Sequence, residues 1–111
     1  MGPERHEEYL EDFGPVRLRT TFRRQGGRLG DWGVQLEWYD PEERAWVWVA
    51  RYDTAVGRPH RDRNRIAAHE PVPLPQDPAQ ALKAAQMDLR TRLEEYIEAY
   101  RAAKAQGRQG W

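Results

Sequence analysis

Residues 51–65 bring together the side-chain types needed for acid–base chemistry and for anion binding. This segment contains one histidine, two aspartates and five arginines. An imidazole exchanges protons near neutral pH, a neighbouring carboxylate can orient it, and guanidinium groups attract phosphate or carboxylate. We therefore predict catalytic roles for His60 and Asp53. The predicted binding residues are Arg51, Arg58, Arg61, Asp62, Arg63 and Arg65.

The same segment has a purely structural interpretation. In it, Asp53 caps a turn and His60 is a surface residue. The arginines pair with Asp62 and with the acidic residues near the N-terminus. The residue types alone do not decide between a charge-paired loop and a working site.

His69 supplies a second imidazole close to His60 in the sequence. Across a hairpin joining the third and fourth predicted strands, the two rings would form an acid–base pair of the kind that cleaves RNA without a metal ion. One imidazole would activate the 2′-hydroxyl and the other would protonate the leaving oxygen. A metal site of Asp53, His60, Asp62 and His69 is an alternative with suitable ligand types. Their spacing matches no recognised motif, so we predict no metal ion.

A second set of arginines shares one face of a strand that the alternation of residues predicts over 15–25. Arg17, Arg19 and Arg23 would follow a phosphate backbone there. Exposed Tyr39 or Trp111 would stack on bases. Alternatively, Glu37 and the acidic N-terminal segment pair with these arginines. The net charge of zero argues against strong nonspecific binding of nucleic acid but leaves a local patch open.

The composition limits the possible chemistry. The chain has 111 residues, enough for one modest core, and it has no Cys and no Ser. Disulfides, thiolate metal sites and Ser or Cys nucleophiles are therefore excluded. The glycine-rich segment 26–30 lies between predicted strands, so it does not predict a dinucleotide site, and we expect no organic cofactor. No apolar run is long enough to span a membrane and no signal peptide is recognisable, which predicts a cytoplasmic protein.

The predicted elements place the charged segment at the rim of a sheet. Alternating residues predict strands over 15–25, 32–39 and 46–53, and a fourth strand over 65–70 follows the charged loop. Residues 4–12 are predicted as a short acidic helix. Proline-rich residues 71–75 predict an extended connector. Asp77 is a predicted N-cap with Pro78 at the first helical position, and spacings of three and four then predict one helix. Its outer face, which includes Asp88, is predicted to be solvated.

These elements predict an α+β fold in one domain, 1–111. It is a three- to four-stranded antiparallel β-meander with one long C-terminal helix packed on its aromatic face. The predicted parts are an acidic N-terminal segment (1–14), the sheet (15–70), a Pro-rich linker (71–77), the helix (78–105) and a flexible tail (106–111).

The segment 32–100 resembles the TumE-type toxins of toxin–antitoxin systems and related small bacterial families. The residues that carry the resemblance are Arg51, Tyr52, Asp53, Pro59 and His60. They form an aromatic–Asp pair at a strand end and a His-containing turn, which a closing helix follows. Where those toxins tend to carry further histidines, Arg61 and Asp62 follow His60.

The resemblance implies a toxin-like protein that acts on RNA or translation, with Asp53 and His60 as its site, or a relative that has lost this activity. It also implies a partner protein, such as a cognate antitoxin, at the sheet edge or at the acidic N-terminal segment. A non-enzymatic interaction module or accessory subunit that uses the same charged loop is the rival prediction. The oligomeric state is left open.

Overall fold

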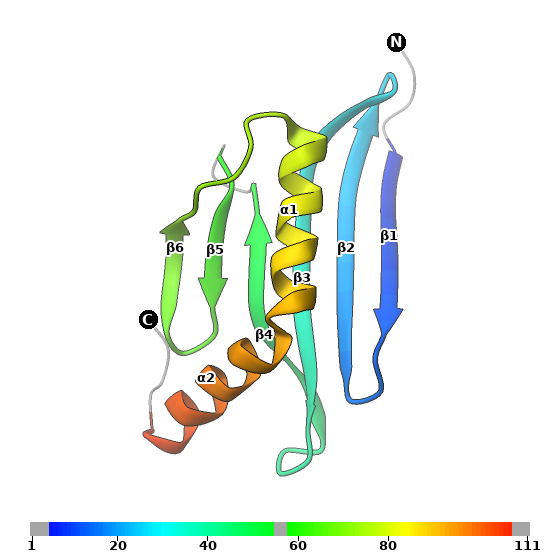
Figure 1. Cartoon of the computed structure of the whole chain (residues 1–111). Helices are drawn as coiled ribbons and strands as arrows, with labels where there is room; N and C mark the ends of the chain where they lie inside the picture. Colours follow the sequence, from blue (N-terminus) through cyan, green and yellow to red (C-terminus); the bar gives the residue numbers. More distant parts are fainter. Residues whose placement is uncertain (1–4, 55–57, 108–111) are drawn as a thin grey trace.

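The computed structural model describes residues 5–54 and 58–107, and these form one antiparallel sheet covered on one face by two helices (Figure 1). The α+β class is confirmed, whereas the predictions of three or four strands and of one helix are wrong. The six strands follow one another in sequence order across the sheet. They are β1 (Arg5–Asp12), β2 (Val16–Gln25), β3 (Arg28–Asp40), β4 (Ala45–Asp53), β5 (His60–Arg63) and β6 (Ala67–Pro71). The helices are α1 (Pro78–Thr91) and α2 (Leu93–Ala105).

The central meander β2–β3–β4 confirms the three strands that residue alternation predicted. Its first hairpin has a two-residue loop, since Gln25 pairs with Arg28. Gly26 and Gly27 occupy this loop with φ of 58° and 78°. Such left-handed conformations at both positions match the twist of the flanking strands and favour glycine.

The N-terminal segment is a strand, and the predicted acidic helix over 4–12 is wrong. β1 pairs with β2 along its whole length. Its acids contact β2 arginines, with Glu8 Oε1 3.0 Å from Arg19 Nη1 and Glu7 Oε2 3.3 Å from Arg24 Nε. Opposite charges on facing strands stabilise an antiparallel pair. The acids of the N-terminal segment therefore pair with arginines of β2 across the two strands.

The predicted loop between Asp53 and Arg65 contains a strand. β5 pairs with β4, with Asp53 opposite His60 and Arg51 opposite Asp62. Burial alternates along β5, because His60 and Asp62 are buried while Arg61 and Arg63 are half-buried. Charged residues therefore occupy both faces of β5. Because the segment is polar throughout, we predicted a loop, although its backbone is extended. The fourth strand predicted over 65–70 exists as β6, and residues 55–57 lie outside the described part.

Two helices replace the single helix predicted over 78–105. Asp77 caps α1 as predicted, because its Oδ2 accepts from Gln80 N–H at 3.0 Å. The break lies at Arg92, whose φ is −112°. Just before it, the Thr91 hydroxyl donates to Met87 C=O at 2.7 Å, an interaction that bends helices. The spacing of apolar residues continues from Leu89 to Tyr96, so the pattern gave no sign of the break.

The core lies between the helices and the face of the sheet that they cross (Figure 1). Trp32 is buried there, and Trp38 packs edge-on against Tyr100 of α2. The largest fully buried apolar side chains are Leu18, Val34, Leu36, Val49 and Leu89. No described helix is long and apolar enough to cross a membrane. Trp111 and most of the predicted tail lie outside the described residues.

Candidate functional site

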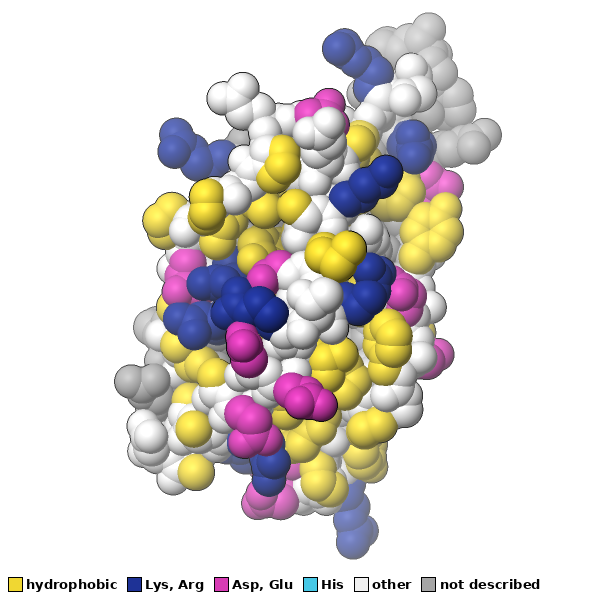
Figure 2. All heavy atoms as spheres, in the orientation of Figure 1, with side chains coloured by type: hydrophobic (Ala, Val, Ile, Leu, Met, Phe, Trp, Pro, Cys, Tyr) yellow, Lys and Arg dark blue, Asp and Glu magenta, His cyan; other side chains and the backbone are white. Residues whose placement is uncertain are grey.

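The predicted catalytic residues lie on the face of the sheet that carries no described helix, which we call the open face. Tyr52 faces the helices, because its hydroxyl donates to Asp88 of α1 at 2.6 Å. Successive strand residues point to opposite faces, so Arg51 and Asp53 face away from the helices. Their β5 partners are Asp62 and His60, and paired residues share a face. Accordingly, no histidine is visible on the helix-covered face in Figure 2.

Four predicted site residues form one ion-paired cluster on the open face. His60 Nε2 lies 3.0 Å from Asp53 Oδ1 and 3.7 Å from Asp62 Oδ2. Arg51 lies between the two carboxylates, 3.2 Å from Asp53 Oδ2 through Nε and 3.2 Å from Asp62 Oδ2 through Nη2. His60 Nδ1 lies 3.4 Å from the carbonyl oxygen of Arg58. The structure therefore brings both predicted catalytic residues into contact.

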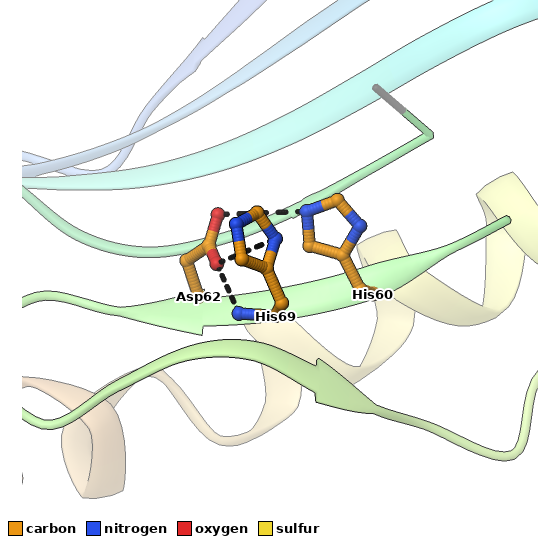
Figure 3. Close-up of side chains that lie close together, drawn as sticks. All are labelled: His60, Asp62 and His69. Carbon is orange, nitrogen blue, oxygen red and sulfur yellow. Dashed lines mark hydrogen bonds and ion pairs between the residues drawn. The ribbon is translucent and has the colours of Figure 1, made fainter. Parts of the chain in front are cut away.

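His69 joins this cluster from β6. Its ring centroid lies 4.6 Å from that of His60, and the two planes meet at 63° (Figure 3). The backbone N–H of His69 donates to Asp62 Oδ1 at 2.7 Å. The predicted meeting of the two histidines is confirmed, although they meet across the β5–β6 hairpin and not between the third and fourth strands. His69 is exposed over 63% of its side chain and His60 over 5%.

Asp62 is the buried carboxylate that connects the two imidazoles. Burial alone would raise its pKa, but hydrogen bonds from His69 N–H and Arg51, together with the charges of His60 and Arg51, lower that pKa below its ordinary value. Asp62 is thus an ionised group that contacts three side chains of the cluster.

Arg61 and Arg63 point to the other face of β5 and bind groups outside this cluster. Arg61 donates to Tyr96 Oη at 2.9 Å, and both Arg61 and Arg63 bind Glu70 on the helix-covered face. Arg65 occupies the β5–β6 turn with a φ of 67°. The alternation of strand residues therefore divides the predicted binding set between opposite faces.

Arg58 lies at one end of the sheet, beside a cavity of about 440 Å³. The cavity lies between the sheet, the connector that follows β6 and the start of α1. Its apolar lining includes Trp32, Val72, Leu74 and Pro78. Neither His60 nor His69 contributes to it, so this cavity is separate from the histidine cluster.

Arg17 and Arg19 of β2 bind carboxylates on the open face, as the structural alternative predicted. Glu37 is buried and accepts from Arg17 Nε at 2.5 Å and from Arg19 Nε at 3.1 Å. Burial alone would raise the pKa of Glu37, but hydrogen bonds from Arg19, Arg17 and Gln35 lower it.

Two tryptophans of β4 also belong to the open face. Arg17 lies over the Trp46 ring at 4.0 Å and Arg51 lies over the Trp48 ring at 4.7 Å. Both rings are half-buried. The open face therefore combines guanidinium groups with aromatic rings, and both ring and guanidinium planes stack on bases.

Asp88 is a polar centre that the sequence did not predict. We expected its side of the helix to be solvated, yet it accepts from the hydroxyls of Tyr52 and Tyr96 and from Arg92. Burial alone would raise the pKa of Asp88, but these hydrogen bonds lower it. The contacts join α1 and α2 to the sheet, so this centre stabilises the fold. The only feature of the sequence that could have indicated this role is that Asp88 lies between the apolar positions Ala85 and Leu89.

Comparison with known proteins adds a family but no activity. No curated protein and no solved structure matched the chain significantly. The resemblance to TumE-type toxins therefore stays a prediction. One family matched residues 3–106 and is described as a domain of unknown function (DUF7718). The match covers nearly the whole chain, which therefore belongs to the DUF7718 family.

Proposed function

We propose that this chain binds RNA on its open face and cleaves it by acid–base catalysis at the His60–His69 pair. The observation that carries the proposal is the 4.6 Å separation of the two imidazoles, one supported by Asp53 and the other exposed. In this role the chain is the toxin-like component of a toxin–antitoxin pair, as its resemblance to TumE-type toxins implies.

The reaction needs two proton transfers, and the pair supplies two imidazoles. One ring accepts the proton of the 2′-hydroxyl, whose oxygen then attacks phosphorus, and the other protonates the leaving 5′-oxygen. The products are a 2′,3′-cyclic phosphate and a free 5′-hydroxyl. Because His69 exposes most of its side chain, we assign the first contact with RNA to His69. His60 supplies the second imidazole, and Asp53 holds it at 3.0 Å.

Arg51 is the arginine of this cluster, and we assign it to the reacting phosphate, which would replace one of its carboxylate contacts. Its guanidinium group reaches two carboxylates of the cluster and lies over the Trp48 ring. Arg17 and Arg19 extend the positive charge along the same face, but Glu37 offsets part of it. We therefore expect RNA binding that weakens strongly as salt concentration rises.

Product analysis on a short single-stranded RNA tests the proposal. We expect wild type to release 2′,3′-cyclic phosphate ends in the presence of EDTA, and His69→Ala to slow cleavage at least about 100-fold. His6→Ala is the matched control, since His6 is an exposed histidine of β1 outside the cluster, and it should leave the rate unchanged. Equal rates for His69→Ala and wild type would reject the catalytic role.

A second candidate function is protein binding at the outer strand β1, and a separate observation favours it. Tyr9, Leu10 and Phe13 are exposed over 57%, 44% and 41%. β1 is the first strand of the described sheet, and an edge strand can pair with a strand from another protein. An antitoxin or another partner bound there should be lost with Tyr9→Lys and kept with Tyr39→Lys. Retention of the partner by Tyr9→Lys would reject this candidate.

A further inference from the structure

The donor atoms of His60, Asp62 and His69 have the composition of a transition-metal site. Two imidazole nitrogens and one carboxylate oxygen lie within 4.8 Å of one another (Figure 3). Imidazole suits zinc, copper, iron and nickel, and a set of two histidines and one carboxylate leaves coordination positions open. We propose that this cluster binds one Zn²⁺ ion, in a state of the chain distinct from the metal-free one proposed to cleave RNA, because a ligated imidazole nitrogen does not exchange a proton.

The strands bring the three ligands together on one face. His60 and Asp62 are two residues apart on β5, so both side chains lie on the open face. His69 reaches them across the hairpin, with a backbone φ of 53° that is rare outside glycine. Its N–H bond to Asp62 Oδ1 fixes this arrangement. Two rigid strands thus hold three ligands from different directions.

The ligand atoms must close around an ion, because one donor atom from each residue gives separations of up to 4.8 Å. His60 Nε2 is 3.7 Å from Asp62 Oδ2, and His69 Nδ1 is 3.9 Å from Asp62 Oδ1. Around tetrahedral zinc, ligand atoms at about 2.0–2.2 Å from the metal lie roughly 3.3–3.6 Å apart. Rotation of the exposed His69 ring provides most of this movement. The open side of that ring is also the path by which the hydrated ion enters.

The groups behind the ligands favour metal binding. His60 Nδ1 faces the Arg58 carbonyl oxygen at 3.4 Å, so Nε2 would be the ligand atom, and the ion would replace its 3.0 Å contact with Asp53 Oδ1. A ligating histidine usually bonds a carbonyl or carboxylate through its other nitrogen in this way. Asp53 and Asp62 place carboxylate oxygens 3.0 Å and 3.7 Å from His60 Nε2, next to the position that the ion would take. Asp53 lies beside His60 Nε2 and is placed to bind a water molecule on the ion.

Titration of tag-free, EDTA-treated protein with ZnCl₂ tests the proposal. Calorimetry should give one ion per chain for wild type and for His6→Ala. His69→Ala, which removes an exposed ligand, should weaken binding at least about tenfold. Absence of zinc binding by wild type, or equal affinity in His69→Ala and wild type, would overturn the proposal.

Nuclear magnetic resonance of the wild-type protein locates the bound ion without the use of a variant. The imidazole signals of His60 and His69 should shift together with added Zn²⁺, while those of His6 stay in place. Shifts confined to His6, or to carboxylates elsewhere, would also overturn the proposal. Because both measurements report binding and neither reports RNA cleavage, the metal site and the proposed function can fail separately.

Discussion

Asp53 and His60 face each other across the β4–β5 strand pair, with 3.0 Å between Asp53 Oδ1 and His60 Nε2. Asp53→Asn keeps the shape of this side chain but removes its charge. We expect it to lower the rate of RNA cleavage about 10-fold or more, since an ionised carboxylate orients the imidazole. Asp31→Asn, at an exposed position of β3, is the control for the loss of one negative charge. An unchanged rate in Asp53→Asn would show that the pair is structural.

Glu37 should make stability depend on pH in the acid range. Its folded pKa lies below its ordinary value of 4.5, so the ionised carboxylate stabilises the fold above that pH. We expect Glu37→Gln to lower the free energy of unfolding by about 1–3 kcal/mol at neutral pH. The difference from wild type should stay constant above about pH 5.5 and shrink as pH falls below about 4.5.

Urea unfolding at several pH values measures this difference. Glu98→Gln, which changes an exposed carboxylate bound to Arg101, should cost about 1 kcal/mol or less at every pH. A Glu37→Gln effect that grows as the pH falls would contradict the expected sign.

Asp88 and Tyr52 should contribute unequally to stability. Asp88→Ala leaves the buried hydroxyls of Tyr52 and Tyr96 without their acceptor, and each unsatisfied group costs about 1–3 kcal/mol. Tyr52→Phe removes one donor and leaves the other bonds of Asp88, so we expect a loss of about 0.5–1.5 kcal/mol. Chemical denaturation of both variants checks the order, and a larger loss for Tyr52→Phe would contradict it.

Leu89 tests the packing of α1 on the sheet. Its side chain is completely buried, whereas Met87 on the same helix is 56% exposed. Leu89→Ala should lower the free energy of unfolding by about 2–5 kcal/mol because it leaves a cavity. Met87→Ala should change it by about 0.5 kcal/mol or less, as at other surface positions. Thermal unfolding compares the two, and similar losses would contradict the described packing.

The sequence predicted the elements whose apolar residues follow one simple period. The alternation from Val16 to Phe22 and the Asp77–Pro78 start of α1 both agree with the structure. β1 and β5 could not be recognised in this way, because their residues do not alternate between apolar and polar and their partners lie on a neighbouring strand. Glu8 with Arg19, and Asp62 with Arg51, are contacts that no local pattern contains.

The site was predicted only in part for the same reason. His60, Asp53, Asp62 and Arg51 meet as expected, because β4 and β5 place them opposite one another. Arg61 and Arg63 were predicted to share a binding surface with Arg51, because β5 was predicted as a loop. In a loop, unlike a strand, alternate residues need not point to opposite faces. Asp88 was predicted to be solvated, because the helical pattern alone does not show which residues of the sheet pack against the helix. In the structure, the Tyr52 hydroxyl donates to Asp88.

The central claim is that RNA meets the open face around His69. A 2′-O-methyl RNA strand, which cannot be cleaved by attack of its 2′-hydroxyl, allows contact to be measured by nuclear magnetic resonance. We predict that its addition shifts the signals of Arg51, His60 and His69 and leaves those of Ala85 and Leu89 in α1 unchanged. Shifts confined to the helix-covered face, or none at millimolar RNA, would contradict the account.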